Sequence, residues 1–285
     1  MFSVESIVTF LGDALVVAGL GVIALQWVYR RRKAMADPEE GDVGVWRGRF
    51  EDFVVVVFLS GFVFMVIPTV VGAFPLFGKG DRESVMFWKH LLGAAATLGV
   101  IFGLMRSVGF IEPISFFCRR RLARVFRWGE WHPLLFLIGA EAVVWLGGLV
   151  AEVVDIFLRQ GWGVSLGLEE KQAMVLLIMR HRGDGWFMVS AALSVAVAAP
   201  VLEEVFFRGL LYPLFKRICG VFPAACLTGV IFGAAHFSAP AFLPLTFFGV
   251  YLCLVYEKTG DLRAPVLAHG FHNVTTFCLI MAGWG

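Results

Sequence analysis

Long apolar runs recur along the whole sequence and are separated by short polar segments. A helix needs about 20 apolar residues to cross the ~30 Å hydrocarbon core of a membrane. We therefore predict an all-α fold, a polytopic transmembrane helical bundle of about eight spans. The predicted helices cover residues 7–28, 53–74, 86–110, 134–158, 186–217, 222–237, 241–256 and 264–284.

Two apolar segments do not fit a simple crossing. The predicted helix over residues 186–217 is longer than one crossing requires, so we expect it to tilt, to kink near Pro200 or to project from the membrane. Residues 172–179 are apolar but too few to span, and we expect a short interfacial or re-entrant helix there.

Composition and charge distribution agree with a membrane protein. Hydrophobic residues make up 59% of the chain and charged residues only 16%, against about one quarter in an ordinary soluble domain. The mean hydropathy is +0.81. The net charge is only +2, but basic clusters at 30–33 and 119–121 predict cytoplasmic loops against the lipid surface, and not nucleic-acid patches. We predict a multi-pass protein of the bacterial inner (cytoplasmic) membrane.

Polar side chains inside three of the spans need an explanation, because burying such groups in hydrocarbon is costly. A rise of ~1.5 Å per residue places them in a common slab about 10 to 20 Å below the cytoplasmic surface. We therefore predict one hydrated site that is reached from the cytosol. Its candidate residues are Glu203, Glu204 and Arg208 in the first span, His236 in the second, and His269 and Asn273 in the third.

The spacing of the first group separates the roles of its two carboxylates. Adjacent helical residues point about 100° apart, so Glu203 and Glu204 cannot face the same partner. Glu204 and Arg208 are four apart with the acid first, which favours an ion pair. We therefore assign Glu203 as the general base, with His236 sharing the proton, and the other two residues as a supporting pair.

His269 and Asn273 are also four residues apart, so their side chains share one helix face. Both side chains can donate hydrogen bonds, as the oxyanion of a tetrahedral intermediate requires. Together with an activated water, these groups predict a peptide-bond hydrolase that forms no covalent intermediate.

Three motifs in this part of the chain resemble a known family. They are EExxxR at 203–208, FxxxH at 232–236 and HxxxN at 269–273, in this order and in separate spans. The chain is similar over residues 186–284 to the CPBP family, also called ABI or type II CAAX proteases, which are intramembrane glutamic endopeptidases. The resemblance implies that Glu203 and His236 activate water.

The resemblance further implies that His269 and Asn273 stabilise the oxyanion, while Glu204 and Arg208 complete the first motif. It implies no cofactor and no metal. It also implies a membrane-tethered protein or peptide as the substrate, cleaved near its C-terminus.

The remaining parts of the chain carry weaker predictions. We divide it into an accessory region, residues 1–133, with N-terminal helices and basic loops, and a catalytic core, residues 134–285. Within the core, we expect Glu141 to form a structural hydrogen bond to a neighbouring helix. His272 lies inside the third motif on a different face from His269, and we assign it no role. We expect Phe207 and Phe232 to be packing residues.

Other functions remain open from the sequence. In one alternative, the buried charges have no catalytic role and form an ion-pair network that holds the helices together. A zinc-dependent membrane protease is possible with Glu203, His236 and His269 as ligands, although neither HExxH nor HxxEH occurs. A non-enzymatic immunity or scaffold protein of the same fold and a proton-coupled transporter are the further alternatives.

Overall fold

The computed structural model describes residue 54 and residues 91–99, 101–103, 133–168 and 173–283. Every regular element within these residues is a helix and none is a strand, which confirms the all-α fold. The predicted span over 7–28, both basic clusters and nearly all of the span over 53–74 lie outside the described residues. The division at residue 133 stays a prediction.

Three helices in the described part are long and apolar enough to cross a membrane: Phe136–Trp162, Gly185–Cys219 and Ala239–Thr259. The first belongs to α6, Pro133–Trp162, which corresponds to the predicted span over 134–158 and extends four residues beyond it. These helices make the chain an integral membrane protein. The total of about eight spans extends beyond the described residues and stays a prediction.

The second of these helices is one continuous run that contains two wider, π-helical turns. In chain order it comprises α8 (Gly185–Leu193), η2 (Ser194–Ala198), α9 (Ala199–Phe206), η3 (Phe207–Leu211) and α10 (Tyr212–Cys219).

Pro200 explains the first wide turn, because proline has no backbone N–H to bond the carbonyl four residues earlier. The N–H of Ala199 instead bonds the Ser194 carbonyl, five residues back. The distortion expected near Pro200 therefore takes the form of a π-helical turn. Pro213 follows the second wide turn in the same way.

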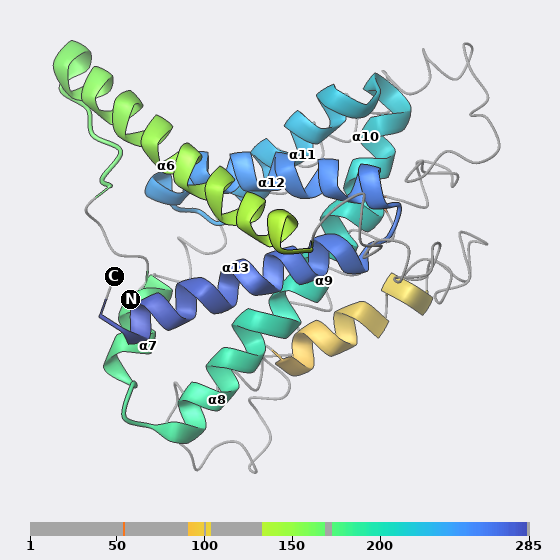
Figure 1. Ribbon diagram of the computed structural model, residues 1–285, viewed down its shortest axis with the longest axis horizontal. Helices are drawn as coiled ribbons and strands as arrows, with labels where there is room; N and C mark the ends of the chain where they lie inside the picture. The colour runs from red at the N-terminus through yellow and green to blue at the C-terminus, as the bar shows by residue number, and fades with distance from the viewer. Residues whose placement is uncertain (1–53, 55–90, 100, 104–132, 169–172, 284–285) are drawn as a thin grey trace, which may run out of the picture.

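Helices α11 (Val221–Ala234) and α12 (Ala239–Thr259) lie side by side with their backbones in contact (Figure 1). A Cβ atom added to Gly249 would lie 2.8 Å from the Cα atom of Gly229, so only glycine fits this crossing. Gly229 and Gly233 are four residues apart and form the small-residue face typical of membrane helix pairs. The close approach brings the α12 backbone near the polar site.

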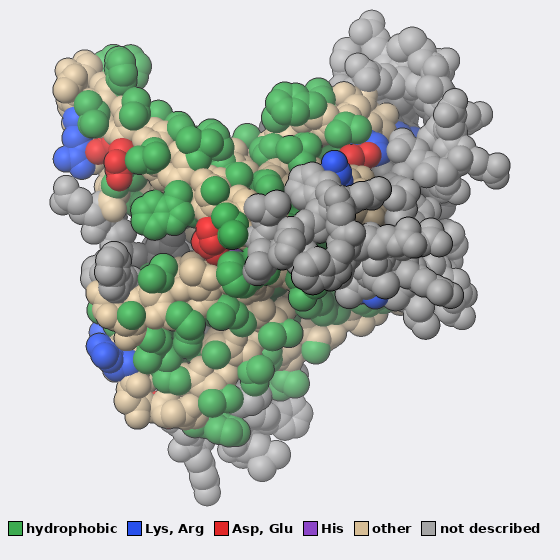
Figure 2. Space-filling view, viewed as in Figure 1, with side chains coloured by type: hydrophobic (Ala, Val, Ile, Leu, Met, Phe, Trp, Pro, Cys, Tyr) green, Lys and Arg blue, Asp and Glu red, His purple; other side chains and the backbone are tan. Residues whose placement is uncertain are grey.

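Helix α13 (Arg263–Met281) runs through the centre of the molecule (Figure 1). It packs against α6, α12, η2 and α9, and also contacts α7 (Ala173–Arg180), the short helix predicted over 172–179. Apolar side chains are spread over the described face in Figure 2 and charged side chains there are few, as lipid contact requires. The three polar motifs thus reach the interior from α9 and η3, from the C-terminal end of α11, and from α13.

Candidate active site

Glu204 and Arg208 form the predicted ion pair at the junction of α9 and η3. Both side chains are fully buried, and Arg208 Nη1 lies 2.8 Å from Glu204 Oε1. Arg208 Nη2 donates a second hydrogen bond, also 2.8 Å long, to the carbonyl of Gly249. The guanidinium also lies 4.8 Å from the ring centroid of Phe232, a cation–π contact that the sequence did not predict.

His269 of α13 binds the same carboxylate oxygen. Its Nδ1 atom lies 2.8 Å from Glu204 Oε1, and its side chain is only 4% exposed. A carboxylate paired with Arg208 only accepts hydrogen bonds, so Nδ1 carries the hydrogen. The other ring nitrogen, Nε2, is thereby directed toward Glu203 and lies 3.9 Å from its Oε2 atom.

His236, two residues beyond the end of α11, also lies near Glu203. Its Nδ1 atom lies 2.8 Å from the carbonyl oxygen of Phe232, which again fixes the hydrogen on Nδ1. Its Nε2 atom lies 3.9 Å from Glu203 Oε2. This oxygen is buried without a hydrogen-bond partner among the described residues. Both distances exceed a direct hydrogen bond and suit a water molecule between the groups.

Aromatic rings form the walls around these polar atoms. The fully buried Phe232 ring lies 4.9 Å from the ring of His236 and 5.6 Å from that of His269, centroid to centroid. Phe207 packs edge to face on Phe232 at 5.0 Å, so the packing role predicted for both is confirmed. Apolar walls lower the local dielectric and strengthen every charge interaction inside them.

Asn273 has a partner that the sequence analysis missed. Its Nδ2 atom donates a 2.8 Å hydrogen bond to the carbonyl of Val195 in η2. That carbonyl lacks the usual helical donors, because the N–H of Ala199 bonds Ser194 and the next residue is Pro200. The signal was present in the proline five residues after Val195. The second N–H of the amide is left for another acceptor.

A second histidine–carboxylate pair joins α6 to α13. His272 Nδ1 lies 3.1 Å from Glu141 Oε2, which confirms the interhelical hydrogen bond expected for Glu141. The identity of its partner, His272, did not follow from the sequence. The signal was the presence of two titratable side chains in separate apolar spans, each of which needs a partner.

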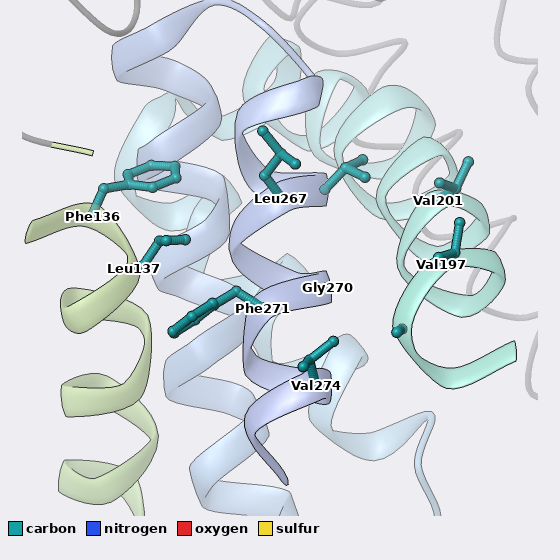
Figure 3. Close-up of a pocket in the computed structure, with 10 residues that line it drawn as sticks. Phe136, Leu137, Val197, Val201, Leu267, Gly270, Phe271 and Val274 are labelled. Carbon is teal, nitrogen blue, oxygen red and sulfur yellow. The ribbon is translucent and has the colours of Figure 1, made fainter. Parts of the chain in front are cut away.

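An apolar cavity of about 490 Å³ lies beside the polar site, between α6, α13 and the η2–α9 segment (Figure 3). Gly270, which follows His269, forms part of its wall, and a Cβ atom there would lie 2.9 Å from the carbonyl oxygen of Ala196. All lining residues are apolar: Phe136, Leu137, Ala196, Val197, Val201, Val266, Leu267, Gly270, Phe271 and Val274.

The site thus consists of carboxylates, imidazoles and an amide inside a bundle of membrane helices, a class of site suited to acid–base chemistry within a bilayer. Residues 185–275 match the family model described as type II CAAX prenyl endopeptidase Rce1-like. This match confirms the resemblance over the segment that carries all three motifs. No solved structure matches the chain.

Several curated proteins share sequence with it. Human CAAX prenyl protease 2 is 31% identical over 30% of this chain and 32% of its own length. The putative membrane peptidase YdiL of Bacillus subtilis (strain 168) is 30% identical over 30% of this chain and 34% of its own length. An uncharacterized 24.3 kDa protein of Escherichia coli is 29% identical over 50% of this chain and 66% of its own length. The chain thus spans about a third of the first two relatives.

Proposed function

We propose that this protein is an intramembrane glutamic endopeptidase. It hydrolyses a peptide bond of a membrane-associated protein or peptide, near the C-terminus of that substrate, with water activated by Glu203 and His236. One observation carries the proposal: a buried carboxylate oxygen of Glu203, which has no hydrogen-bond partner among the described residues, lies 3.9 Å from the Nε2 atoms of two histidines. A water bound there lies between the Glu203 carboxylate and the two imidazole rings.

The hydrolysis follows from the hydrogen positions in the site. Because Nδ1 of His236 carries its hydrogen, a neutral ring presents a lone pair at Nε2. Water gives one proton to Glu203 or His236 while its oxygen attacks the substrate carbonyl carbon. The electrons of the carbonyl π bond move to the oxygen, which becomes an oxyanion. The C=O bond then re-forms as the C–N bond breaks, and the proton taken up by the base passes to the leaving nitrogen. Atoms balance with one water consumed and no covalent enzyme intermediate.

His269 and Asn273 stabilise the oxyanion in this proposal. With Nδ1–H donated to Glu204, the Nε2 atom of His269 carries a hydrogen only when the ring is positively charged. Asn273 contributes the amide hydrogen that does not bond Val195. Two donors, one of them charged, then face the developing negative charge.

Glu204 and Arg208 support the site without touching the substrate. Arg208 compensates the charge of a carboxylate that is completely buried, and this carboxylate orients His269. Such fixed partners hold the imidazole in one orientation before the reaction, which avoids reorganisation during it.

The substrate proposal rests on the site's position in the membrane and on the relatives. A site inside a helix bundle is reached by a chain that is already held at the bilayer. The human relative is named a CAAX prenyl protease and the Bacillus relative a membrane peptidase. We propose the bacterial inner membrane as the location, and a lipid-linked or membrane-anchored C-terminal segment as the substrate.

The test is C-terminal proteomics of cells that carry the wild type or Glu203→Gln at equal, verified expression. Glu152→Gln is the matched control, because Glu152 is an exposed carboxylate on α6, outside the site. We expect new C-termini in wild-type and control cells that are absent with Glu203→Gln. An identical peptide profile in all three would contradict proteolysis and favour an immunity or scaffold role.

A further inference from the structure

The pair formed by Glu141 and His272 lies inside the membrane but outside the three motifs' catalytic roles. Two titratable side chains in apolar helices are costly, so their presence indicates a function. Their hydrogen bond, 3.1 Å from Nδ1 to Oε2, joins residues 131 positions apart. The other oxygen of Glu141 is buried without a partner among the described residues, so nothing there replaces the histidine as its hydrogen-bond donor.

The part of α6 that carries Glu141 is fixed to α12. The Tyr251 hydroxyl donates a 2.7 Å hydrogen bond to the carbonyl of Phe136, on one side of Glu141. On the other side, Gly147 lies so close to Pro244 that an added Cβ atom would be 2.6 Å from the proline Cα. The position of Glu141 is therefore fixed relative to α12, and so is the acceptor that it offers to His272.

Helix α13 is less completely packed: it approaches η2 closely at Gly270, but apolar space remains along other parts of the same face. The cavity of about 490 Å³ separates it there from α6 and from η2 (Figure 3). Besides its packing contacts, α13 makes three polar bonds, one each to a different element: His269 to Glu204, His272 to Glu141, and Asn273 to Val195. Without the second bond, α13 can roll about the other two into the empty space.

Such a roll would reach the proposed catalytic groups directly. His272 and His269 are three residues apart and contact the same ring, that of Phe248, with centroid distances of 4.8 and 5.5 Å. The ring is fully buried and lies against both imidazoles. A displacement of His272 is therefore passed to His269, whose Nε2 must stay aimed at Glu203.

We infer that Glu141 is a positioning residue: through His272 it fixes the rotation of α13 and so the place of His269 in the site. The inference rests on the proposed peptidase function for its kinetic test, and it has a structural test that does not. A misplacement of about 1 Å in a catalytic group can cost about 100-fold in rate.

The experiment compares Glu141→Leu, which removes the acceptor, with Glu141→Gln, whose side-chain carbonyl still accepts from His272. Glu152→Leu on the same helix is the control. Each is reconstituted in lipid vesicles, and kcat and KM are measured on a peptide found by the proteomics above. Hydrogen exchange of the α13 amides is recorded in parallel. His272→Phe, which keeps a ring against Phe248 but lacks the donor, serves as an independent variant if Glu141→Leu does not fold.

We expect kcat to fall about tenfold or more in Glu141→Leu and in His272→Phe, at a KM within about twofold. The α13 amides should exchange faster in both, while the glutamine and Glu152→Leu variants stay close to wild type. Wild-type kcat and exchange in Glu141→Leu, or equal losses in the leucine and glutamine variants, would overturn the inference. If the wild type cleaves nothing, the proposed function fails and the exchange data alone judge the positioning role.

Discussion

Helix α13 carries two histidines that each bind a glutamate from a distant helix, and the two pairs differ in their surroundings. His269 and Glu204 are 4% and 0% exposed, and Arg208 adds a positive charge at the same carboxylate oxygen. His272 and Glu141 are 12% and 23% exposed and include no arginine. The bond lengths are 2.8 and 3.1 Å.

The difference shows what complete burial demands of a carboxylate. A fully desolvated charge needs an opposite charge, and Arg208 supplies it for Glu204. The Glu141 side chain is 23% exposed, and its partner among the described residues is the imidazole of His272. The same pair of residue types can therefore serve two tasks: one pair sets the electrostatics beside Glu203, and the other fixes the helix that carries His269.

Replacing each histidine by glutamine should give the largest contrast between the pairs. His269→Gln removes a ring that faces Glu203 and a proposed oxyanion donor, so kcat/KM should fall about 100- to 1,000-fold. His272→Gln should cost only about tenfold, because His272 acts only through the position of α13. Cleavage by reconstituted protein measures both. Equal losses in the two variants would remove the distinction.

Stability should separate the pairs next. Arg208→Leu leaves the buried Glu204 carboxylate without its cation and should destabilise the fold by about 3 to 5 kcal/mol. Glu141→Leu should cost less, about 1 to 3 kcal/mol, because it leaves a single hydrogen-bond donor, that of His272, without its acceptor. Denaturant unfolding in mixed micelles gives both values. A loss of unfolding free energy in Arg208→Leu that is no larger than the loss in Glu141→Leu would contradict the role given to the arginine charge.

The third anchor of α13 should show a smaller but specific effect. Asn273→Ala leaves the Val195 carbonyl without its donor, which costs about 1 to 3 kcal/mol. Pro200→Ala restores a backbone N–H near that carbonyl, so it should recover part of the loss in the double variant and gain less alone. A double-mutant cycle of unfolding free energies measures this coupling. Additive effects would show that the proline does not create the need for Asn273.

Local rules predicted much of the described fold, and long-range contacts account for what they missed. Apolar run length found the helices from residue 133 onward, and the four-residue spacing found the bond between Glu204 and Arg208. Periodicity cannot tell which helices become neighbours, so the contacts of His269 with Glu204 and His272 with Glu141 were not predicted.

Backbone chemistry explains the third missed contact. A proline frees carbonyls in its own helix, but the sequence does not say which side chain will bond them. The contact between Asn273 and Val195 depends on α13 crossing η2 beside Gly270, where an added Cβ would lie 2.9 Å from the Ala196 carbonyl oxygen.

The central claim is that Glu203 activates a water molecule for peptide hydrolysis. The most direct measurement compares the cleavage rates of Glu203→Gln and the wild type in lipid vesicles, each with and without a zinc chelator. The substrate is a peptide whose processing in cells depends on the wild-type protein. We predict a loss of about 100-fold or more for the variant and no effect of the chelator on the wild type. Wild-type cleavage by the glutamine variant, or cleavage abolished by the chelator and restored by zinc, would contradict the account.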